Sequence, residues 1–345
     1  MSQKACEQGR AWSEPVKVAQ TCRRRHLAGL GRRNDLDTAL RLSTAIVAVL
    51  LAARSIQAAE QATTRPAGGP GTTLVPVPPE MRKDIPPARS REEISSLIRQ
   101  QDTLATPRKL HIVLLAGPKD HGPGEHDYPA WQKAWARLLA GTKQTRVTLA
   151  WDKLGEQDLK SADVIVIFKH FAWPKESNPD VEAFLERGGG LVLLHFAVDG
   201  GDNGEFVGKC IGPYWGQGAK FRHGWVDLVF EDKPNQPFLR GLAGRTVKFH
   251  DETYWRLTGD ASKIEVLATA MEEDGNGKIS IPLVWNRQVG KGRVHVNILG
   301  HYNWTFNDPV FRVLVLRAIA LAASEPIDRF DSLATVGIDS KNESR

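Results

Sequence analysis

Cysteine is scarce in this chain of 345 residues, which contains only three. Cys6 and Cys22 lie close to the N-terminus, so Cys210 is alone in the rest of the chain. A single cysteine excludes an intrachain disulfide framework in that part. Because Cys210 lacks the strand-to-helix context of a nucleophile, we predict a buried and unreactive thiol.

An excess of positive charge is also missing beyond residue 59. The formal net charge of +6 is contained in residues 1–59, where ten Lys and Arg face four acidic residues, and residues 60–345 carry 36 charges of each sign. A surface that binds nucleic acid needs clustered basic residues to neutralise phosphates. The even balance of charge therefore predicts that nucleic acid is not a partner.

Long apolar runs are absent as well. The run at residues 42–53 has twelve residues, whereas a membrane-spanning helix needs about twenty. Arg41 precedes this run and small residues follow it, which is typical of a signal peptide, and two upstream arginine pairs resemble a twin-arginine signal. We expect a leader over residues 1–59, a periplasmic or secreted protein and no stable span in the mature chain. A start codon assigned too early explains the long basic segment equally well.

Three further segments follow the leader. Residues 60–108 are a Pro-, Gly- and Thr-rich linker with a short helix from Arg91, and this composition cannot bury a core of its own. Residues 109–324 contain periodic apolar segments and form the predicted domain. Residues 325–345 are predicted to be a polar, frayed tail.

Strand and helix patterns alternate in the first half of the domain. Continuous apolar runs such as residues 111–116 predict strands that are buried on both faces of a parallel sheet. Asp127 with Pro129 marks the start of one helix, and Asn178 with Pro179 the start of another. This alternation predicts a doubly wound α/β sheet. Its strands are expected near residues 111–116, 145–151, 162–168 and 190–196.

The pattern changes after residue 198. Residues 199–220 are predicted to be a long loop, and the segments that follow have strand patterns without long helices between them. The C-terminal half therefore adds extra strands to the sheet, and a closing helix begins after Asp308. The additional strands are expected near residues 224–230, 247–257, 264–271, 282–286 and 293–299.

Histidines follow several of the predicted strands. His121 and His126 lie in the loop after the first strand, His195 ends the fourth, and His301 follows the last. Loops after neighbouring parallel strands meet at one edge of the sheet, where α/β proteins bind ligands. We therefore predict that histidines distant in sequence converge there. The chain places other histidines near strand ends at His170, His223 and His250.

Imidazoles at such an edge indicate acid–base chemistry with a neighbouring carboxylate. His195 or His121 is the candidate general base, Glu252 the acid or orienting group, and His301 the group that polarises a substrate oxygen. Asp251 and Glu252 are adjacent on an extended segment, so only one of them enters the site. A divalent metal held by the same side chains is an alternative, although no HxH or HExxH spacing supports it and the cofactor is undetermined.

A nucleotide is a poor candidate ligand. Gly188-Gly189-Gly190 precedes a strand, whereas phosphate-binding glycine loops follow one. Indole rings suit the apolar face of a sugar, so Trp285 and Trp304 are candidate stacking residues, and packing in the core is the alternative role for each. The remaining candidate contacts to a substrate are His126, Asp251 and Tyr254.

Several motifs of the chain together resemble the ThuA-like, or trehalose-utilisation, family. The resemblance implies a flavodoxin-like fold related to class I glutamine amidotransferases and a role in sugar utilisation, and it points to His121, His195, Glu252 and His301. Amidotransferases place a nucleophilic cysteine where this chain has His195, so the resemblance does not imply glutaminase activity. The motifs are residues 117–126, Gly188 to His195, His250 to Tyr254, Pro282 to Trp285, Gly290 to Val294 and Leu299 to His301.

The sequence thus predicts an exported enzyme that acts on a carbohydrate or keto-sugar derivative by histidine and carboxylate chemistry. A non-catalytic carbohydrate-binding module is one alternative, and a metal-dependent hydrolase is another. The predicted partner is a small sugar-type molecule, and the oligomeric state is undetermined.

Overall fold

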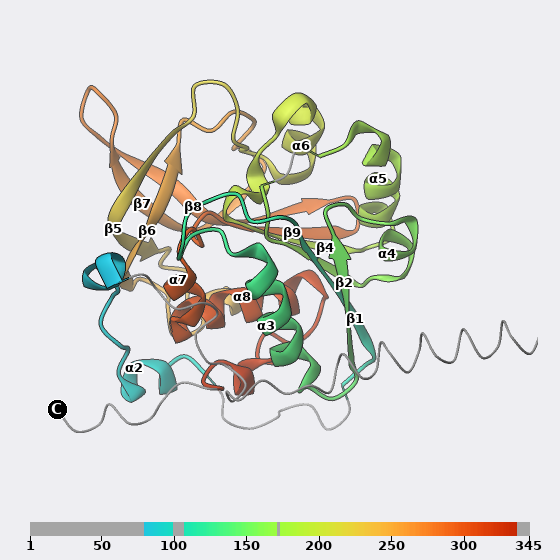
Figure 1. The fold of residues 1–345 in the computed structure, drawn as a ribbon, viewed down its shortest axis with the longest axis horizontal. Helices are drawn as coiled ribbons and strands as arrows, with labels where there is room; N and C mark the ends of the chain where they lie inside the picture. Colours follow the sequence, from blue (N-terminus) through green and yellow to red (C-terminus); the bar gives the residue numbers. More distant parts are fainter. Residues whose placement is uncertain (1–78, 99–106, 171–172, 337–345) are drawn as a thin grey trace, which may run out of the picture. The chain divides into compact units, whose positions relative to one another are not determined.

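The computed structural model describes residues 79–98, 107–170 and 173–336, all within the unit formed by residues 68–345 (Figure 1). The predicted leader, most of the Pro-rich linker and the end of the predicted tail lie outside the described residues. In the described part, no helix is long and apolar enough to cross a membrane.

A nine-stranded mixed sheet is the centre of the fold, with the strand order β2-β1-β3-β4-β9-β8-β7-β5-β6. The first five strands in this order are parallel, and the remaining pairings are antiparallel. The parallel strands are β1 (Leu110–Ala116), β2 (Thr145–Trp151), β3 (Val164–Ile167), β4 (Gly190–Leu194) and β9 (Gly292–Asn297). The antiparallel strands are β5 (Lys220–Phe230), β6 (Thr246–Trp255), β7 (Glu265–Glu273) and β8 (Lys278–Val289).

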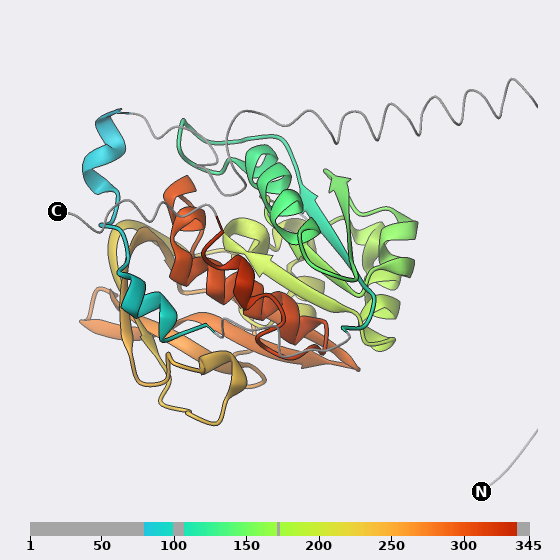
Figure 2. The same ribbon diagram turned by 90° about the horizontal axis from the view of Figure 1, so that it is seen from below.

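Helices cover both faces of the parallel half. Figures 1 and 2 show α3 and α8 on one face of the sheet and α5 and α6 on the other. The α-helices are α2 (Arg91–Ser95), α3 (Tyr128–Ala140), α4 (Glu156–Ser161), α5 (Asn178–Glu186), α6 (Gly204–Ile211), α7 (Asn303–Asn307) and α8 (Pro309–Ala322). The 3-10 helices are Pro79–Asp84, Lys175–Ser177, His195–Val198, Gly201–Asn203, Pro237–Leu239 and Asp331–Leu333.

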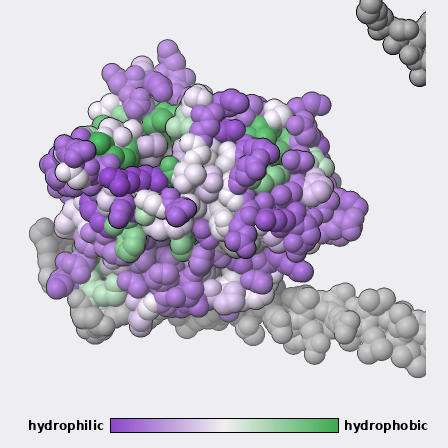
Figure 3. Space-filling view, turned by 90° about the horizontal axis from the view of Figure 1, so that it is seen from above, coloured by the Kyte–Doolittle hydropathy of each residue, from purple (hydrophilic) through white to green (hydrophobic). Residues whose placement is uncertain are grey.

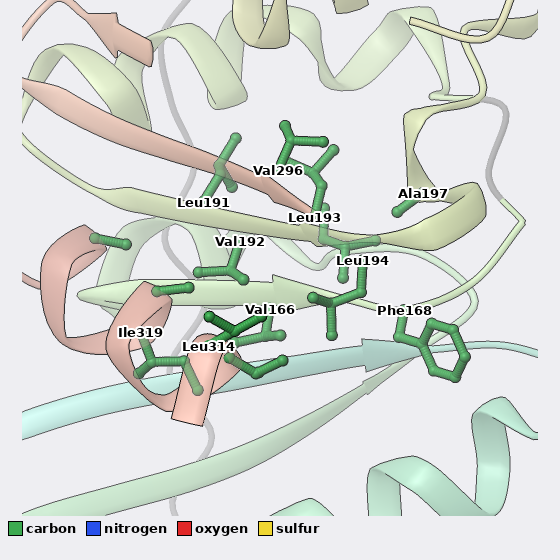
Figure 4. Close-up of a cluster of buried hydrophobic side chains, with 14 of the residues drawn as sticks. Val166, Phe168, Leu191, Val192, Leu193, Leu194, Ala197, Val296, Leu314 and Ile319 are labelled. Atoms are coloured by element: carbon green, nitrogen blue, oxygen red, sulfur yellow. The ribbon is translucent and has the colours of Figure 1, made fainter. Parts of the chain in front are cut away.

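The hydrophobic core lies on both faces of the parallel strands, and α8 covers one of these faces. Figure 4 shows Leu314 and Ile319 of α8 next to Val166 and Val192, while Leu191 projects toward the opposite face. Every residue of β3 and β4 is buried, as expected for strands that are covered on both faces. This packing fixes where β3 and β4 end, and therefore where the loops after them begin.

The predicted strands and the main predicted helices are confirmed. Asp127 caps α3, since its side chain accepts a hydrogen bond of 3.1 Å from Ala130 N, and Cys210 is buried as predicted. The mixed α/β class and the extra C-terminal strands are confirmed as well. Residues 325–336 are not frayed: Phe330 is fully buried, and Arg240 pairs with Asp328 at 3.2 Å.

Three helices were missing from the prediction. Residues 199–220 are not a continuous loop, because they contain α6, whose apolar residues Phe206, Val207, Cys210 and Ile211 face the core. The prediction missed this helix because it contains two glycines, Gly204 and Gly208, and glycine is typical of loops. Gly204 and Gly208 lie against the ring of Tyr214, where a Cβ atom would approach to between 2.6 and 3.1 Å. The other two missing helices are short: α4 lies between β2 and β3, and α7 lies between β9 and α8.

Exposed hydrophobic side chains are few and mostly lie on edge or antiparallel strands. Figure 3 shows separate hydrophobic areas between larger hydrophilic ones on one face of the molecule. Leu149 and Trp151 lie on the edge strand β2, and Phe221 and Trp225 lie on β5. The Phe221 ring lies next to that of His223.

Candidate active site

Four buried polar side chains converge at the carboxyl end of the parallel strands. They are His126 from the loop after β1, His195 directly after β4, Glu252 on β6 and His301 after β9. One donor atom from each lies within 4.8 Å of all the others. These four residues, called the buried cluster below, are a set of ligand types that can hold a divalent metal ion.

Two of these histidines have a strained backbone. The φ angles are 42° at His126 and 54° at His195, in the left-handed region that L residues with a Cβ rarely adopt. Such a conformation costs on the order of 1–3 kcal/mol and persists where the surrounding structure enforces it. At His195 the turn comes directly after the buried strand β4, so strand packing and strain together fix the direction of the imidazole.

Asp251 positions the other two members of the cluster. Its carboxylate is fully buried and accepts hydrogen bonds from the backbone N–H groups of Glu252, Gly300 and His301, at 2.7, 3.0 and 2.9 Å. These bonds connect β6 to the loop after β9. Asp251 therefore has a supporting role rather than the predicted contact with a substrate. Alternation along the strand predicts that one of the two acidic residues enters the site, and that residue is Glu252.

The side chains of the cluster are in direct contact. His195 Nε2 lies 2.8 Å from His126 Nε2 and 3.2 Å from Glu252 Oε2. His301 Nδ1 lies 2.9 Å from the same Glu252 oxygen. The Tyr254 hydroxyl donates to Glu252 Oε2 at 3.1 Å and lies 2.9 Å from His195 Nε2. Tyr254 is thus a fifth polar group in the floor of the site.

Burial and charge set the protonation of the cluster. Burial, which outweighs the hydrogen bond to Asp120, lowers the pKa of His126 to about 3. Burial opposes the charge on Glu252, but its contacts with His195 and His301 outweigh this effect and lower the pKa of the carboxyl below its usual range. Burial raises the pKa of Tyr254 well above its usual value. At neutral pH the floor therefore combines a neutral imidazole, a carboxylate and a phenol.

Three more accessible imidazoles border the buried cluster. The His121 ring lies 3.7 Å from that of His126 between centroids, at an interplanar angle of 48°, and the His223 ring lies 4.7 Å from that of His301. His170 stacks at 4.2 Å on Phe196, the residue after His195. Each of the three side chains is between 39 and 45% exposed, so protons can exchange with solvent there.

Asp120 connects two of these imidazoles with the cluster. Its Oδ1 atom accepts hydrogen bonds of 2.9 Å from Nδ1 of both His121 and His126. Burial opposes the charge on Asp120, but hydrogen bonds from His126, His170 and His121 outweigh it and lower the pKa of the carboxyl. Asp120 and Asp199 in turn raise the pKa of His170 to about 9, so His170 is a cation at neutral pH.

Aromatic rings border the site on one side. The Trp215 ring lies 4.8 Å from that of Tyr254 and 6.2 Å from that of Phe221. Phe221 is 53% exposed and lies 5.6 Å from His223. The cluster is therefore next to an accessible aromatic surface that suits the C–H face of a ring-shaped ligand.

The structure brings most of the predicted site residues together. Six of them surround one position, namely His121, His126, His195, Glu252, Tyr254 and His301. Trp285 does not belong there, because it is fully buried in the core and donates through Nε1 to Ile211 O at 2.8 Å. Trp304 also has no ring face for a ligand in the cluster: it is buried, stacks on Tyr302 at 4.1 Å and donates to His250 O.

Other residues of the site were not predicted. His170 contacts both Asp120 and Asp199 next to the site. Trp215 and Phe221 supply the aromatic side of the site. The position of His170 just after β3 was an available signal, since the same rule selected His195. Trp215 and Phe221 lie in a segment whose path cannot be derived from strand periodicity.

One protein family matches the sequence of this chain. A sequence profile named ThuA and described as "Trehalose utilisation" matches residues 118–322, which is more than half of the chain and contains every member of the buried cluster. The chain belongs to the ThuA family. The predicted resemblance is therefore confirmed, while the family description by itself defines no reaction.

Solved structures similar to this ThuA-family chain include two ThuA-like proteins. The protein from Bacteroides uniformis is 18% identical with a TM-score of 0.51, and the match covers 67% of this chain and 99% of that one. The protein from Parabacteroides merdae is 21% identical with a TM-score of 0.49, over 63% of this chain and 90% of that one. The first similarity shows a shared fold. The comparison with curated proteins gave no match.

Proposed function

We propose that this ThuA-family chain is an enzyme that transfers protons on a carbohydrate or keto-sugar derivative. The observation that supports this proposal best is the convergence of the buried cluster with accessible histidines at one sheet edge. The family description agrees with a sugar-type substrate. The strand order β2-β1-β3-β4-β9 supports a flavodoxin-like parallel half, in which ligands bind beyond the carboxyl ends of the strands.

His121 is the best candidate for the general base. Asp120 accepts from Nδ1 of His121 at 2.9 Å, which leaves a lone pair on Nε2, and the His121 ring is 5.5 Å from that of His301. A carboxylate that orients an imidazole in this way selects its tautomer, as in nucleophile–histidine–aspartate triads. His195 is less suitable because both of its ring nitrogens contact other residues in the buried interior.

The floor of the site has a different part in this proposal. His301 and Tyr254 hold a substrate oxygen and balance the negative charge that develops on it during proton transfer. The Glu252 carboxylate orients both groups through its contacts of 2.9 and 3.1 Å. The cationic His170 keeps Asp120 charged and in place through their 3.5 Å contact. Trp215 and Phe221 receive the apolar face of the sugar ring, where the aromatic surface is accessible.

The experiment is a turnover assay in heavy water. Full-length protein is incubated with glycosides and the corresponding keto-glycosides, with added divalent cations and with a chelator in parallel, and NMR records products and deuterium exchange next to the carbonyl. We expect turnover or exchange with at least one keto-sugar. The variant His121→Gln should lower kcat by about 10²–10⁴-fold and change KM little, because it removes the base.

The matched control is His111→Gln. His111 lies on β1, where its ring is bonded to Ser161 O and Thr148 Oγ1, away from the cluster. Its kcat should equal that of the wild type. Full turnover by His121→Gln would refute the assigned base. Saturable sugar binding without exchange or product would instead support the carbohydrate-binding module, and hydrolysis only with added cations would support the metal-dependent hydrolase.

We propose in addition that the chain is exported. The basis is the sequence of residues 1–59 alone, where a basic segment precedes a twelve-residue apolar run. Fractionation of expressing cells and N-terminal sequencing test this proposal. Cleaved protein in the periplasm or medium supports it, and uncleaved protein in the cytoplasm contradicts it.

A further inference from the structure

We propose that His126, His195, His301 and Glu252 form a binding site for one divalent transition-metal ion, with zinc as the first candidate. The inference does not depend on the proposed substrate or reaction, because ion binding is measured without turnover. It follows from the positions of ring protons in the buried cluster, taken one histidine at a time.

The outer nitrogen of His195 carries a proton. Its Nδ1 atom lies 2.8 Å from the carbonyl oxygen of Ile298, which can only accept a hydrogen bond. In a neutral imidazole only one nitrogen is protonated. A metal ion binds the neutral form, in which the other nitrogen of His195, Nε2, directs a lone pair into the cluster.

The same holds for His126. Its Nδ1 atom lies 2.9 Å from the Asp120 carboxylate and 2.8 Å from the Tyr128 hydroxyl. A lone pair on Nδ1 would face a carboxylate, so Nδ1 carries the proton and the Tyr128 hydroxyl donates to Asp120 Oδ2 at 3.3 Å. The lone pair of His126 Nε2 then points at that of His195 Nε2, only 2.8 Å away.

The remaining donors complete this arrangement. His301 has Nδ1 inside the cluster, and its outer atom Nε2 has a single acidic neighbour in the described ion pairs, Glu125 Oε1 at 3.5 Å. Glu252 Oε2 contacts both His195 and His301, and the Tyr254 hydroxyl is its neutral donor. A proton on His301 Nδ1 would satisfy Glu252 but would leave the lone pairs of His126 and His195 opposed.

A metal ion accounts for all of these contacts at once. Histidine ligands of metals almost always donate their outer N–H to a carboxylate or a backbone carbonyl, which is the pattern at His126 and His195. Zinc–nitrogen bonds of about 2.0–2.1 Å place two ligand nitrogens roughly 3 Å apart, close to the observed contact. Three imidazoles with one carboxylate supply the four ligands of a tetrahedral zinc ion, and a similar transition ion with a higher coordination number would have positions left for substrate oxygens.

The test measures binding on the full-length chain without a histidine tag. Protein is stripped with a chelator, equilibrated with ZnCl2 and analysed by elemental analysis and calorimetry, and CoCl2 serves as a spectroscopic probe. We expect about one zinc per chain, a visible cobalt spectrum of a nitrogen- and oxygen-ligated site, and a higher Tm with zinc. The variants His301→Gln and Glu252→Gln should each weaken zinc binding by at least about 100-fold.

The variant Asp120→Asn tests the hydrogen bond between Asp120 and His126 Nδ1. This variant should weaken zinc binding by about 10–100-fold, because the carboxylate that fixes the tautomer of His126 is lost. The control is His295→Gln, a buried histidine of β9 outside the cluster, which should bind zinc like the wild type. Circular dichroism establishes that each variant is folded. Less than about 0.1 zinc per wild-type chain at micromolar free zinc would overturn the proposal, as would unchanged binding in folded His301→Gln and Glu252→Gln. The wild-type cobalt spectrum decides the question if a variant does not fold.

Discussion

The Nε2 atoms of His126 and His195 lie 2.8 Å apart, although these residues are 69 positions apart in the sequence. They meet because β1 and β4 belong to the same parallel sheet, with only β3 between them, and their C-terminal ends open on one edge. Both residues have positive φ angles, so the contact is maintained against backbone strain. An arrangement that costs free energy in two residues at once is a feature of a functional site rather than of a stable core.

Asp251 is predicted to be the main support of this site. Its buried carboxylate accepts three backbone hydrogen bonds, and Asp251→Asn would replace one acceptor oxygen by a donor. We expect the free energy of unfolding to fall by about 3 kcal/mol, because charged hydrogen bonds are lost and a buried N–H is left unpaired. Urea denaturation measures this change. The control is Asp227→Asn, because the exposed carboxylate of Asp227 lies 3.7 Å from Lys248 Nζ. This control should change the free energy of unfolding by less than about 0.5 kcal/mol. Equal losses in both variants would contradict the prediction.

The sequence predicted those parts of the site that follow from strand ends. His195 and His301 could be placed because each follows a buried apolar run, and loops after neighbouring parallel strands share an edge. Alternation along the strand predicts that only one of Asp251 and Glu252 enters the site, but it does not bring Glu252 there. Its arrival there depends on the bonds between Asp251 and residues 300–301, which connect β6 to a loop distant in sequence.

Other parts of the site depend on tertiary contacts that leave no periodic signal. Asp120 lies in a loop, and its role depends on how that loop folds back over His126. Trp285 is a residue that the sequence placed in the site although it does not belong there. The chemistry of its indole ring suggested a stacking residue, but its burial makes it part of the core. Helix α6 was missed because Gly204 and Gly208 read as loop residues, whereas they allow close contact with Tyr214.

Cys210 is predicted to be unreactive in the folded chain. The thiol is buried, and burial raises its pKa to about 12, so the reactive thiolate is rare at neutral pH. The variant with Cys6→Ser and Cys22→Ser isolates this thiol, and its reaction with a disulfide reagent is followed at pH 8 with and without denaturant. We expect reaction within seconds in denaturant and at the rate of unfolding in its absence. Rapid labelling of folded protein would contradict the buried position.

Gly190 at the start of β4 is predicted to tolerate no side chain. A Cβ atom there would lie 2.8 Å from Ala322 Cβ and nearer still to its carbonyl oxygen, where α8 crosses the strand. We expect Gly190→Ala to lower the free energy of unfolding by about 3 kcal/mol, because the helix must move away from β4. Thermal denaturation compares it with Gly155→Ala, at the exposed N-terminus of α4, where the new Cβ meets only the Asp158 side chain at 3.3 Å. A loss similar to that of Gly155→Ala would show that α8 adjusts freely.

His295 is predicted to make stability depend on pH. It is fully buried on β9, its Nδ1–H donates to Asn286 Oδ1 at 2.9 Å, and burial lowers its pKa to about 3. Above pH 6.5 the residue is neutral in both the folded and the unfolded chain, so its contribution is complete. Between pH 6.5 and about 3 only the unfolded chain takes up the proton, and stability falls by about 1.4 kcal/mol per pH unit from this group.

The variant His295→Gln keeps a hydrogen-bond donor but does not titrate. The free energy of unfolding, measured by urea denaturation at pH 7.5 and 5.5, should therefore fall less in the variant than in the wild type, by about 1.4 kcal/mol. His126 also titrates in this range, but it is unchanged in both proteins and cancels from the difference. Equal pH dependence in the two proteins would mean that His295 is protonated in the folded state. The apolar position of His295 opposes this, since its ring lies 4.9 Å from that of Phe238 between centroids.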